Sequence, residues 1–250
     1  MGSTKRVALI TGASGGIGTA VAEELAAAGV RVVLAYNTNE KAARQLLQTV
    51  RERGGDGVLL QADLRQPEAS IALAVAARRQ YGRLDILVNN AGHALEKLII
   101  DTTAEEWDEL MAVHVRSAFL CAKHVLPCML RQRFGRIINV TSMWGQVGAA
   151  NEVAYSTAKA ALHGFTKALA KEVGPMGVTV NAVAPGVIRT RMIASYSEET
   201  VAELQELTPR DQLGTPHDVA RTVRFLADDA AHFITGQIIG VNGGFVVPSG

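Results

Sequence analysis

The chain has 250 residues, of which 48% are hydrophobic and 20% are charged. This composition is typical of a globular protein with a sizeable core, and it excludes a disordered or collagen-like chain. The 25 basic and 24 acidic residues are spread along the sequence, so no basic stripe is present to hold nucleic acid. Because one α/β domain can reach this length, we expect a single domain over residues 1–250.

The chain shows no sign of export or of membrane contact. It enters the apolar run Val7–Ile10 without a long apolar leader, and Arg6 stands where a myristoylation signal has Ser or Thr. No apolar run is long enough to span a bilayer. Cys121 and Cys128 are too far apart along a helix to form a disulfide. We therefore expect a cytoplasmic protein, and the spacing of the six histidines predicts no metal site.

Short apolar runs alternate along the chain with longer helical periods. This alternation indicates βαβ units around a parallel sheet that is buried on both faces. The sequence therefore predicts an α/β, doubly wound fold with a seven-stranded parallel sheet flanked by helices. The predicted strands are Arg6–Ile10, Arg31–Ala35, Gly57–Gln61, Ile86–Asn89, Gly135–Val140, Val178–Val183 and Gln237–Val241.

Three further features are predicted between the strands. Gly29 is expected to end the first helix, which runs to Ala28, and Asp101–Thr103 are expected to cap the helix that begins near Glu105. The stretch Arg189–Leu213 is polar and prone to form helix, and it lies between a Pro-Gly turn and the last strand. We expect it to be a lid over the substrate.

A glycine-rich loop, Thr11–Gly18, joins the first strand to the first helix. Glycines at this junction let backbone N–H groups approach a pyrophosphate at the positive end of the helix dipole. The alternative is a tight turn with no ligand, but the place of the loop in a repeated βαβ pattern favours dinucleotide binding. The residues predicted to bind are Gly12, Ser14, Gly15, Gly16, Ile17 and Gly18.

The end of the second strand indicates which dinucleotide binds. An acidic residue there would hold the ribose of NAD and repel the extra phosphate of NADP, and residues 36–39 contain no carboxylate. Tyr36, Asn37 and Thr38 are therefore predicted to favour NADP(H), with NAD(H) as the alternative. Asp63 and Leu64 follow the third strand and are predicted to lie at the adenine. Asp63 is equally suited to cap the next helix.

Tyr155 and Lys159 stand four residues apart in a helix-forming segment, so their side chains share one helix face. An ammonium beside a phenol favours the phenolate, which predicts that the pKa of Tyr155 lies below its usual value of about 10. Such a pair suits the exchange of a proton with a carbonyl oxygen, although a solvated helix face gives the same spacing. Ser142 ends the fifth strand and is predicted to hold that oxygen or to form a turn.

Two other strand ends complete the predicted site. Asn90, Ala91 and Gly92 follow the fourth strand, where the amide is expected to tie loops together and the glycine to admit the nicotinamide ribose. The turn after the sixth strand is expected to line the nicotinamide carboxamide. Its predicted contact residues are Pro185, Gly186, Ile188 and Thr190.

Together, these segments resemble the short-chain dehydrogenase/reductase family, and the resemblance extends to Ile234–Gln237 and Val241–Gly244. It implies a Rossmann fold and a homotetramer built in part on the helices that follow the fourth and fifth strands. It also implies that Tyr155 donates the proton, that Lys159 lowers the pKa of Tyr155 and binds the nicotinamide ribose, and that Ser142 orients the carbonyl.

His114 departs from the family pattern, because the family places an asparagine there that helps to hold a water in the proton relay. A histidine preserves the relay if the contact is made by the backbone carbonyl. Alternatively, its imidazole joins the relay, or it is only a packed helical side chain.

Within the family, the chain looks most like bacterial 3-oxoacyl-(acyl carrier protein) reductases. Arg131, Arg133 and Arg136 would offer a basic patch to an acyl carrier protein, but Met176 stands where a second basic position is expected.

Two other functions stay open. His114, Met143–Gly145 and Glu152–Tyr155 resemble a Gram-positive subgroup proposed to reduce a ketone on a modified lysine of elongation factor P. A non-catalytic dinucleotide-binding scaffold is the remaining alternative, and the intact Ser142, Tyr155 and Lys159 argue against it.

Overall fold

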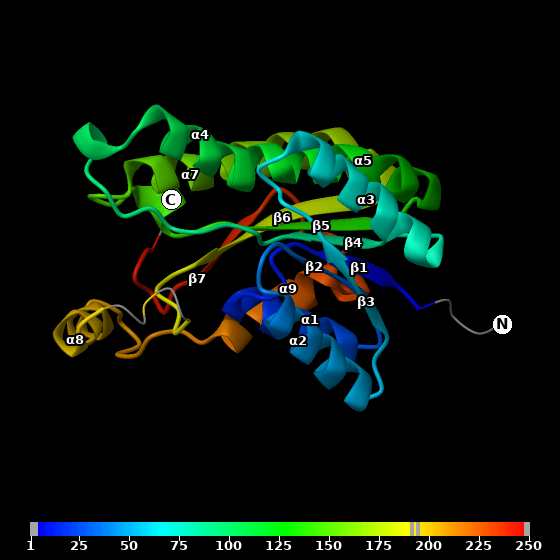
Figure 1. The fold of residues 1–250 in the computed structure, drawn as a ribbon, viewed down its shortest axis with the longest axis horizontal. Coiled ribbons are helices and arrows are strands. Elements are labelled where there is room, and N and C mark those ends of the chain that lie inside the picture. Colours follow the sequence, from blue (N-terminus) through cyan, green and yellow to red (C-terminus); the bar gives the residue numbers. More distant parts are fainter. Residues whose placement is uncertain (1–4, 191–192, 194–195, 248–250) are drawn as a thin grey trace.

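The computed structural model describes residues 5–190, 193 and 196–247. Within these residues, seven parallel strands form one sheet in the order β3-β2-β1-β4-β5-β6-β7 (Figure 1). This order is that of a Rossmann-type, doubly wound sheet, so the predicted fold class is confirmed. The strands are β1 Val7–Ile10, β2 Arg31–Tyr36, β3 Gly57–Gln61, β4 Ile86–Asn89, β5 Gly135–Val140, β6 Val178–Pro185 and β7 Ile238–Val241.

Helices cover both faces of the sheet. α3, α4, α5 and α7 lie on one face, and α1, α2 and α9 lie on the other (Figure 1). A π-helical turn at Ala112–Arg116 joins α4 to α5. The bounds are α1 Gly16–Ala27, α2 Glu40–Glu52, α3 Pro67–Tyr81, α4 Ala104–Met111, α5 Ser117–Gln132, α6 Trp144–Val147, α7 Val153–Val173, α8 Glu198–Glu206 and α9 Pro216–Ala227.

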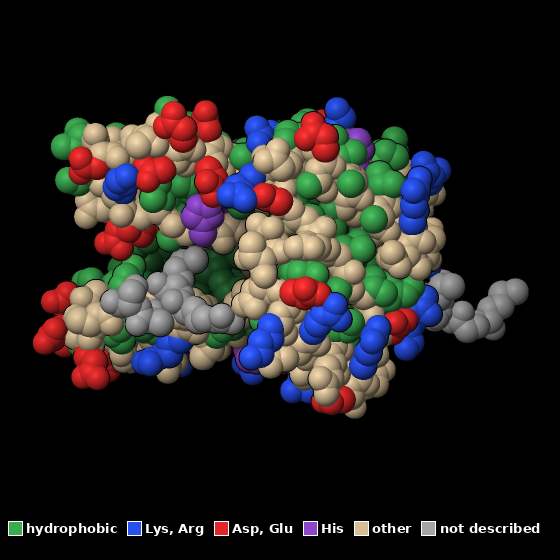
Figure 2. Space-filling model, viewed as in Figure 1, with side chains coloured by type: hydrophobic (Ala, Val, Ile, Leu, Met, Phe, Trp, Pro, Cys, Tyr) green, Lys and Arg blue, Asp and Glu red, His purple; other side chains and the backbone are tan. Residues whose placement is uncertain are grey.

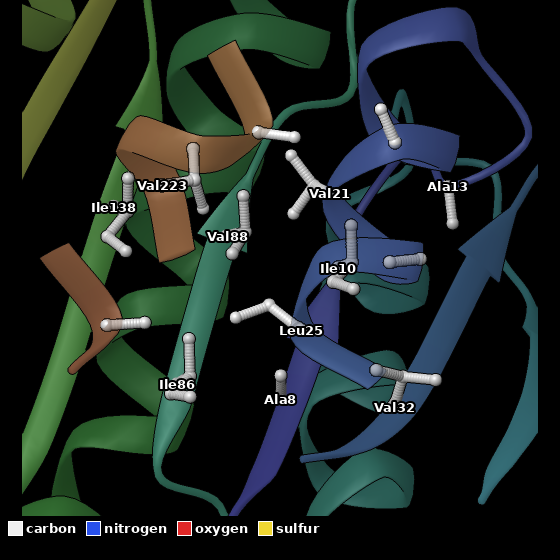
Figure 3. Close-up of a cluster of buried hydrophobic side chains, with 14 of the residues drawn as sticks. Ala8, Ile10, Ala13, Val21, Leu25, Val32, Ile86, Val88, Ile138 and Val223 are labelled. Carbon is white, nitrogen blue, oxygen red and sulfur yellow. The ribbon is translucent and has the colours of Figure 1, made fainter. Parts of the chain in front are cut away.

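The first strand, β1, is apolar at every position because helices cover it on both faces. Side chains alternate between the two faces of a strand, so a strand covered on both faces needs apolar residues at every position. Ala8 and Ile10 pack in the layer beneath α1 and α9 (Figure 3), whereas Val7 and Leu9 pack in the layer beneath α3, α5 and α7. All four side chains are fully buried.

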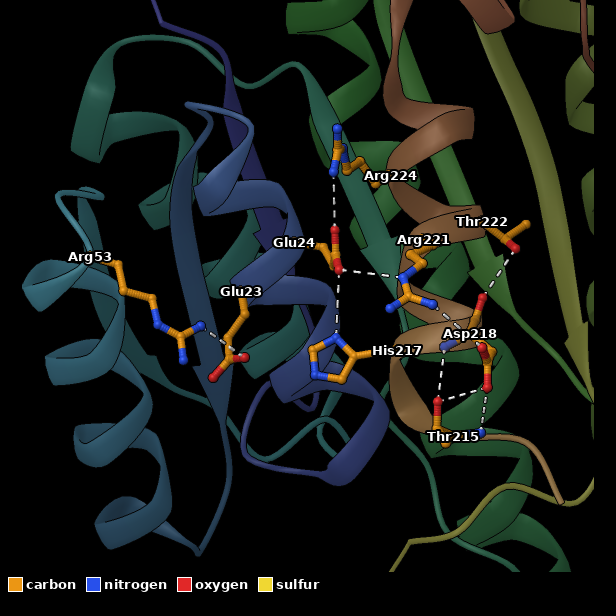
Figure 4. A network of polar contacts seen from close by, with 9 residues as sticks. All are labelled: Glu23, Glu24, Arg53, Thr215, His217, Asp218, Arg221, Thr222 and Arg224. Carbon is orange, nitrogen blue, oxygen red and sulfur yellow. Dashed lines mark hydrogen bonds and ion pairs between the residues drawn. The ribbon is translucent and has the colours of Figure 1, made fainter.

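Ion pairs add to the apolar contact between α1 and α9 (Figure 4). Glu24 of α1 accepts from Arg224 at 3.2 Å and lies 3.6 Å from His217 and 4.0 Å from Arg221, all on α9. The arginines and His217 are about half exposed, so each pair contributes at most about 1 kcal/mol. Apolar burial therefore remains the main force that holds the two helices together.

The predicted helix caps are partly confirmed. Thr103 caps α4 through a capping box with Glu106, and Gly29, with a φ of 81°, follows the end of α1. The cap proposed for Asp63 is wrong, because Gln66 precedes α3 and Asp63 instead binds Arg65.

The predicted lid, Arg189–Leu213, contains α8. Residues 191–192 and 194–195 of this stretch lie outside the described residues. None of the helices described here is long and apolar enough to cross a membrane.

The predicted basic patch is wrong in one of its three members. Arg136 is the second residue of a buried strand and is only 3% exposed. Its guanidinium stacks on Phe134, binds the carbonyl of Gly135 and lies 3.7 Å from Asp229. It also lies at the amino end of β5, away from the carboxyl edge of the sheet where ligands of such folds bind.

Candidate active site

The glycine-rich loop has glycines for two reasons. Gly12 has a φ of +64°, and a Cβ on Gly18 would stand 2.3 Å from the Gly12 carbonyl oxygen. A Cβ on Gly16 would stand 2.9 Å from Thr190. These three glycines therefore serve the packing of the turn itself. Gly15 meets only the Gly12 oxygen, at 3.4 Å, and lines a cavity, as expected of a residue that admits a ligand.

The end of β4 supports this loop. Asn90 donates from Nδ2 to the carbonyl oxygens of Thr11, at 2.9 Å, and Gly12, at 3.2 Å. Asn89 donates to the amide oxygen of Asn139 on β5 at 2.8 Å. These contacts confirm that the amides after the fourth strand tie neighbouring segments together.

Two adjoining cavities lie along the carboxyl edge of the sheet, with volumes of about 770 and 370 Å³. Figure 2 shows the surface hollowed between the upper and lower parts of the molecule, in the left half of the view. All the residues predicted to bind the dinucleotide or to act in catalysis line one cavity or both. The larger contains Gly12, Ser14, Gly15, Gly16, Ile17, Gly18, Asn90, Ala91, Gly92, His114, Ser142, Tyr155, Lys159, Pro185, Gly186, Ile188 and Thr190, and the smaller adds Tyr36, Asn37, Thr38, Asp63 and Leu64.

The chemical centre of the larger cavity is formed by α7 and the end of β5. Tyr155 and Lys159 are 9% and 4% exposed, so the solvated-face alternative is wrong. Lys159 Nζ donates to the carbonyl oxygen of Val140 at 3.0 Å and lies 5.4 Å from the centre of the Tyr155 ring. Ser142 hydrogen-bonds to Tyr155, and its Oγ accepts from the N–H of Trp144 at 3.1 Å. The structure therefore brings the three predicted side chains together.

The ionisation of this centre differs from the prediction. Burial raises the pKa of Tyr155 to about 12; the Ser142 hydrogen bond lowers it, and the charge of Glu152 raises it further. Burial also lowers the pKa of Lys159 to about 7. The predicted lowering of the Tyr155 pKa by Lys159 is therefore not found, because burial removes much of the lysine charge at neutral pH. Tyr155 is protonated at neutral pH and holds a proton to donate.

Two glutamates near Tyr155 were given no role in the site by the sequence argument, which named Glu152 only as part of a family resemblance. Glu152 and Glu96 line the larger cavity. Burial, followed by the charge of Glu96, raises the pKa of Glu152 to about 7. Glu152 stands three residues before Tyr155, a spacing that places both on one side of a helix and was the available signal. Glu96 lies in a loop, and nothing in the sequence pointed to it.

At the end of the site predicted to hold the adenosine, the sequence argument missed Arg65. This residue lines the smaller cavity, and its guanidinium binds Asp63, with Nη2 2.7 Å from Oδ2. Hydrogen bonds from Arg65 lower the pKa of the Asp63 carboxyl. Asp63 is thus a charged, paired group, and the turn near β3 carries the arginine that residues 36–39 lack.

His114 lies in the π-helical turn and is 3% exposed. Its Nε2 is 2.9 Å from the carbonyl oxygen of His93, and its ring stands edge-on to Tyr155 with the centres 5.6 Å apart. Burial first, and then the charge of Lys159, hold the pKa of His114 well below its usual range, so the imidazole is neutral. Nε2 also lies 3.3 Å from the N–H of His93, so it faces both an acceptor and a donor of the same residue. Nδ1 is buried and finds no partner among the described residues.

A parallel sheet of this order, with a glycine-rich loop after its first strand, is the architecture of dinucleotide-binding enzymes. A family model described as enoyl-(acyl carrier protein) reductase matches residues 12–246. The structure of a putative short-chain alcohol dehydrogenase from Sinorhizobium meliloti 1021 superposes with a TM-score of 0.93, at 36% identity and over 97% of each chain. The chain belongs to the short-chain dehydrogenase/reductase family, whose members are oxidoreductases that bind a nicotinamide dinucleotide.

Curated relatives align over almost their whole length. The 3-oxoacyl-[acyl-carrier-protein] reductase of Synechocystis is 42% identical, with 98% of each chain covered. The uncharacterized oxidoreductase YmfI of Bacillus subtilis is 40% identical, covering 96% of this chain and 98% of the relative. The 3-oxoacyl-[acyl-carrier-protein] reductase FabG of Aquifex aeolicus is also 40% identical, with 96% of each covered.

The contact between Gly92 and His114 yields a test of the geometry. A Cβ on Gly92 would stand 2.0 Å from Cε1 of the buried His114 ring. We expect Gly92→Ala to lower the free energy of unfolding by about 1–3 kcal/mol in urea titrations, because this ring has little room to move. In a His114→Asn background the shorter side chain should remove most of that loss.

Gly164 provides the matched control. A Cβ at this position in α7 meets nothing within 4 Å, so Gly164→Ala should stabilise the protein by up to about 1 kcal/mol. An equal loss from Gly92→Ala in both backgrounds would contradict the close contact with His114.

Proposed function

We propose that the chain is a single dinucleotide-binding domain that reduces a 3-oxoacyl group, carried as a thioester on an acyl carrier protein, with NADPH. The observation that carries the proposal is the buried, protonated Tyr155 beside Ser142 in the cavity that also contains the glycine-rich loop. The names of the relatives from Synechocystis and Aquifex aeolicus support the substrate class.

Each side chain of the centre has a defined role in this reaction. When bound, the reduced nicotinamide would supply the hydride to the carbonyl carbon. Ser142 Oγ holds the carbonyl oxygen, and Tyr155 donates its phenolic proton to that oxygen. Lys159 binds the nicotinamide ribose and stabilises the phenolate that remains.

The lining of the cavities fits a dinucleotide. Gly12–Gly18 would hold the pyrophosphate at the amino end of α1, since Gly15 leaves open space there. The residues proposed for the nicotinamide side are Asn90, Ala91, Gly92, Pro185, Gly186, Ile188 and Thr190. Those proposed for the adenosine side are Tyr36, Asn37, Thr38, Asp63 and Leu64.

His114 is proposed to take part in the proton relay. In this role Nδ1, which is buried and has no partner among the described residues, hydrogen-bonds to a water that returns a proton to Lys159, the charge of which already acts on the ring. The His114→Asn variant tests this role. A reduction rate and a pH profile equal to those of the wild type would show that the imidazole has no special part.

The acidic end of the cavity favours one alternative substrate. Glu152 and Glu96 place negative charge beside Tyr155, which suits a ketone with a cationic group better than it suits an acyl chain. A ketone on a modified lysine of elongation factor P is therefore the second candidate. For assembly, the family resemblance supports a cytoplasmic homotetramer packed on α5 and α7.

The first prediction concerns the proton donor. Purified protein should oxidise NADPH in the presence of a small β-keto ester, and Tyr155→Phe should lower kcat by about 10²–10⁴-fold because the proton source is lost. Fluorescence titration should show unchanged NADPH binding. Wild-type turnover by Tyr155→Phe would refute the assigned role.

The choice of dinucleotide can be tested at Asn37. We expect a lower KM for NADPH than for NADH, and Asn37→Asp should reverse this order by placing a carboxylate near the 2′-phosphate. Gln45→Asp, at an exposed position of α2, is the matched control for added charge. A lower KM for NADH in the wild type would overturn the preference for NADPH.

The substrate is tested by direct competition. A 3-oxoacyl thioester on acyl carrier protein should have a higher kcat/KM than the same thioester on a short pantetheine arm or a ketone on elongation factor P. Higher activity on the elongation factor ketone would favour the second candidate. Equal kcat/KM for carrier-bound and carrier-free thioesters would exclude recognition of the carrier.

A further inference from the structure

His163 lies on the same helix as the catalytic pair, four residues beyond Lys159, but outside the lining of both cavities. It is 8% exposed, and its Nε2 is 3.0 Å from Oγ1 of Thr141. Thr141 directly precedes Ser142. A buried imidazole is thus hydrogen-bonded to the residue next to the serine that faces Tyr155.

The direction of this hydrogen bond follows from the other contacts. Thr141 Oγ1 donates its single hydrogen to the carbonyl oxygen of Val183 at 3.0 Å, so it can only accept from His163. Burial, aided by the charge of Lys167, lowers the pKa of His163 to about 4, although the backbone of Gly145 acts in the opposite sense. The ring is therefore neutral near pH 7, and because Thr141 donates to Val183 we assign its one hydrogen to Nε2.

The ring also packs against the segment on the other side of Ser142. A Cβ on Gly145 would stand 2.9 Å from Cε1 of His163 and 2.8 Å from the carbonyl carbon of Lys159. Between residues 141 and 145, the N–H of Met143 donates to the carbonyl oxygen of Pro185 at 2.9 Å. His163 thus contacts residues 141 and 145, on both sides of Ser142.

We propose that His163 is a positioning residue that holds the Ser142 hydroxyl in place for the substrate carbonyl by donating to Thr141 and packing against Gly145. This role rests on the function proposed for Ser142. Ser142 also hydrogen-bonds to Tyr155 and so lowers its pKa. Looser packing of residues 141–145 would therefore change both the contact of Ser142 with the substrate carbonyl oxygen and the pKa of the proton donor, Tyr155.

The experiment compares His163→Leu, which removes the donor, with His163→Gln, which keeps an amide N–H at similar reach. We expect His163→Leu to lower kcat about tenfold with the KM for NADPH within twofold of the wild type, because a small displacement of a catalytic group has a large effect on rate. His163→Gln should restore most of the rate. Wild-type kcat in His163→Leu would overturn the proposal.

A pH profile separates positioning from general destabilisation. In alcohol oxidation Tyr155 must be deprotonated to accept the proton, so at pH values below its pKa of about 12 the rate rises with pH in proportion to the phenolate fraction. Loss of the Ser142 hydrogen bond raises that pKa, so His163→Leu should shift the rise to higher pH. Glu152, Lys159 and His114, the other titratable groups around Tyr155, are unchanged in the variant.

Thr166→Val is the matched control, because Thr166 joins the same helix to the same strand through Asn139, at 2.9 Å, without touching Thr141. Thr166→Val should lower the free energy of unfolding but leave the pH dependence of alcohol oxidation unchanged. An equal shift in both variants would show that the effect is general loosening.

Hydrogen–deuterium exchange gives a readout that does not depend on turnover. The amide of Trp144, which donates to Ser142 Oγ, should exchange several times faster in His163→Leu than in Thr166→Val. Equal exchange would contradict the positioning role. Absence of ketone reduction by the wild type, with faster exchange in His163→Leu, would instead refute the proposed function and leave the structural role of His163 intact.

Discussion

The hydrogen bond from Lys159 to the carbonyl of Val140 joins α7 to the end of β5, and the site is built around it. Val140 is the last residue of its strand, so the bond places the lysine at the carboxyl edge of the sheet, where Ser142 and the glycine-rich loop also lie. It satisfies a buried amine with a neutral acceptor, so the burial of Lys159 shifts its pKa toward neutrality. At neutral pH Tyr155 is therefore uncharged, and Lys159 carries only part of a positive charge.

The sheet and the position of the site could be predicted from the sequence because both depend on local patterns. A strand that is buried on both faces is apolar at every position, as in Val7–Ile10, and turns with glycine mark where such strands end. Parallel strands place all their carboxyl ends at one edge. Residues at or just beyond the ends of different strands, such as Gly12, Asn90, Ser142 and Pro185, therefore had to converge, and all of them line the larger cavity.

What the sequence could not supply was the extent of burial. The spacing of Tyr155 and Lys159 suggested a lowered phenol pKa, but the sign of the shift depends on desolvation by the surrounding elements, and it is reversed. Arg136 was counted as a surface charge, although it lies within a buried strand beside Asp229. His114 contacts Tyr155 and His93 from a π-helical turn, and the periodicity of an α-helix does not predict that geometry.

The rule that predicts NAD or NADP from one residue after β2 is incomplete, because several other charged residues line the cavities. The absence of a carboxylate after β2 favours NADP(H), but the adenosine end also contains Asp63, Arg65 and Glu109, with Arg65 2.7 Å from Asp63 and 3.9 Å from Glu109. The arginine offsets one carboxylate and part of the second, so the local field is weaker than a count of acids implies. At the opposite end no cation among the described residues acts on Glu152; burial, followed by the charge of Glu96, raises its pKa to about 7, so this carboxyl is only partly ionised at neutral pH. The charges are therefore close to balanced at the predicted adenosine end, whereas acidic groups without a paired cation in the described part of the chain lie beside Tyr155.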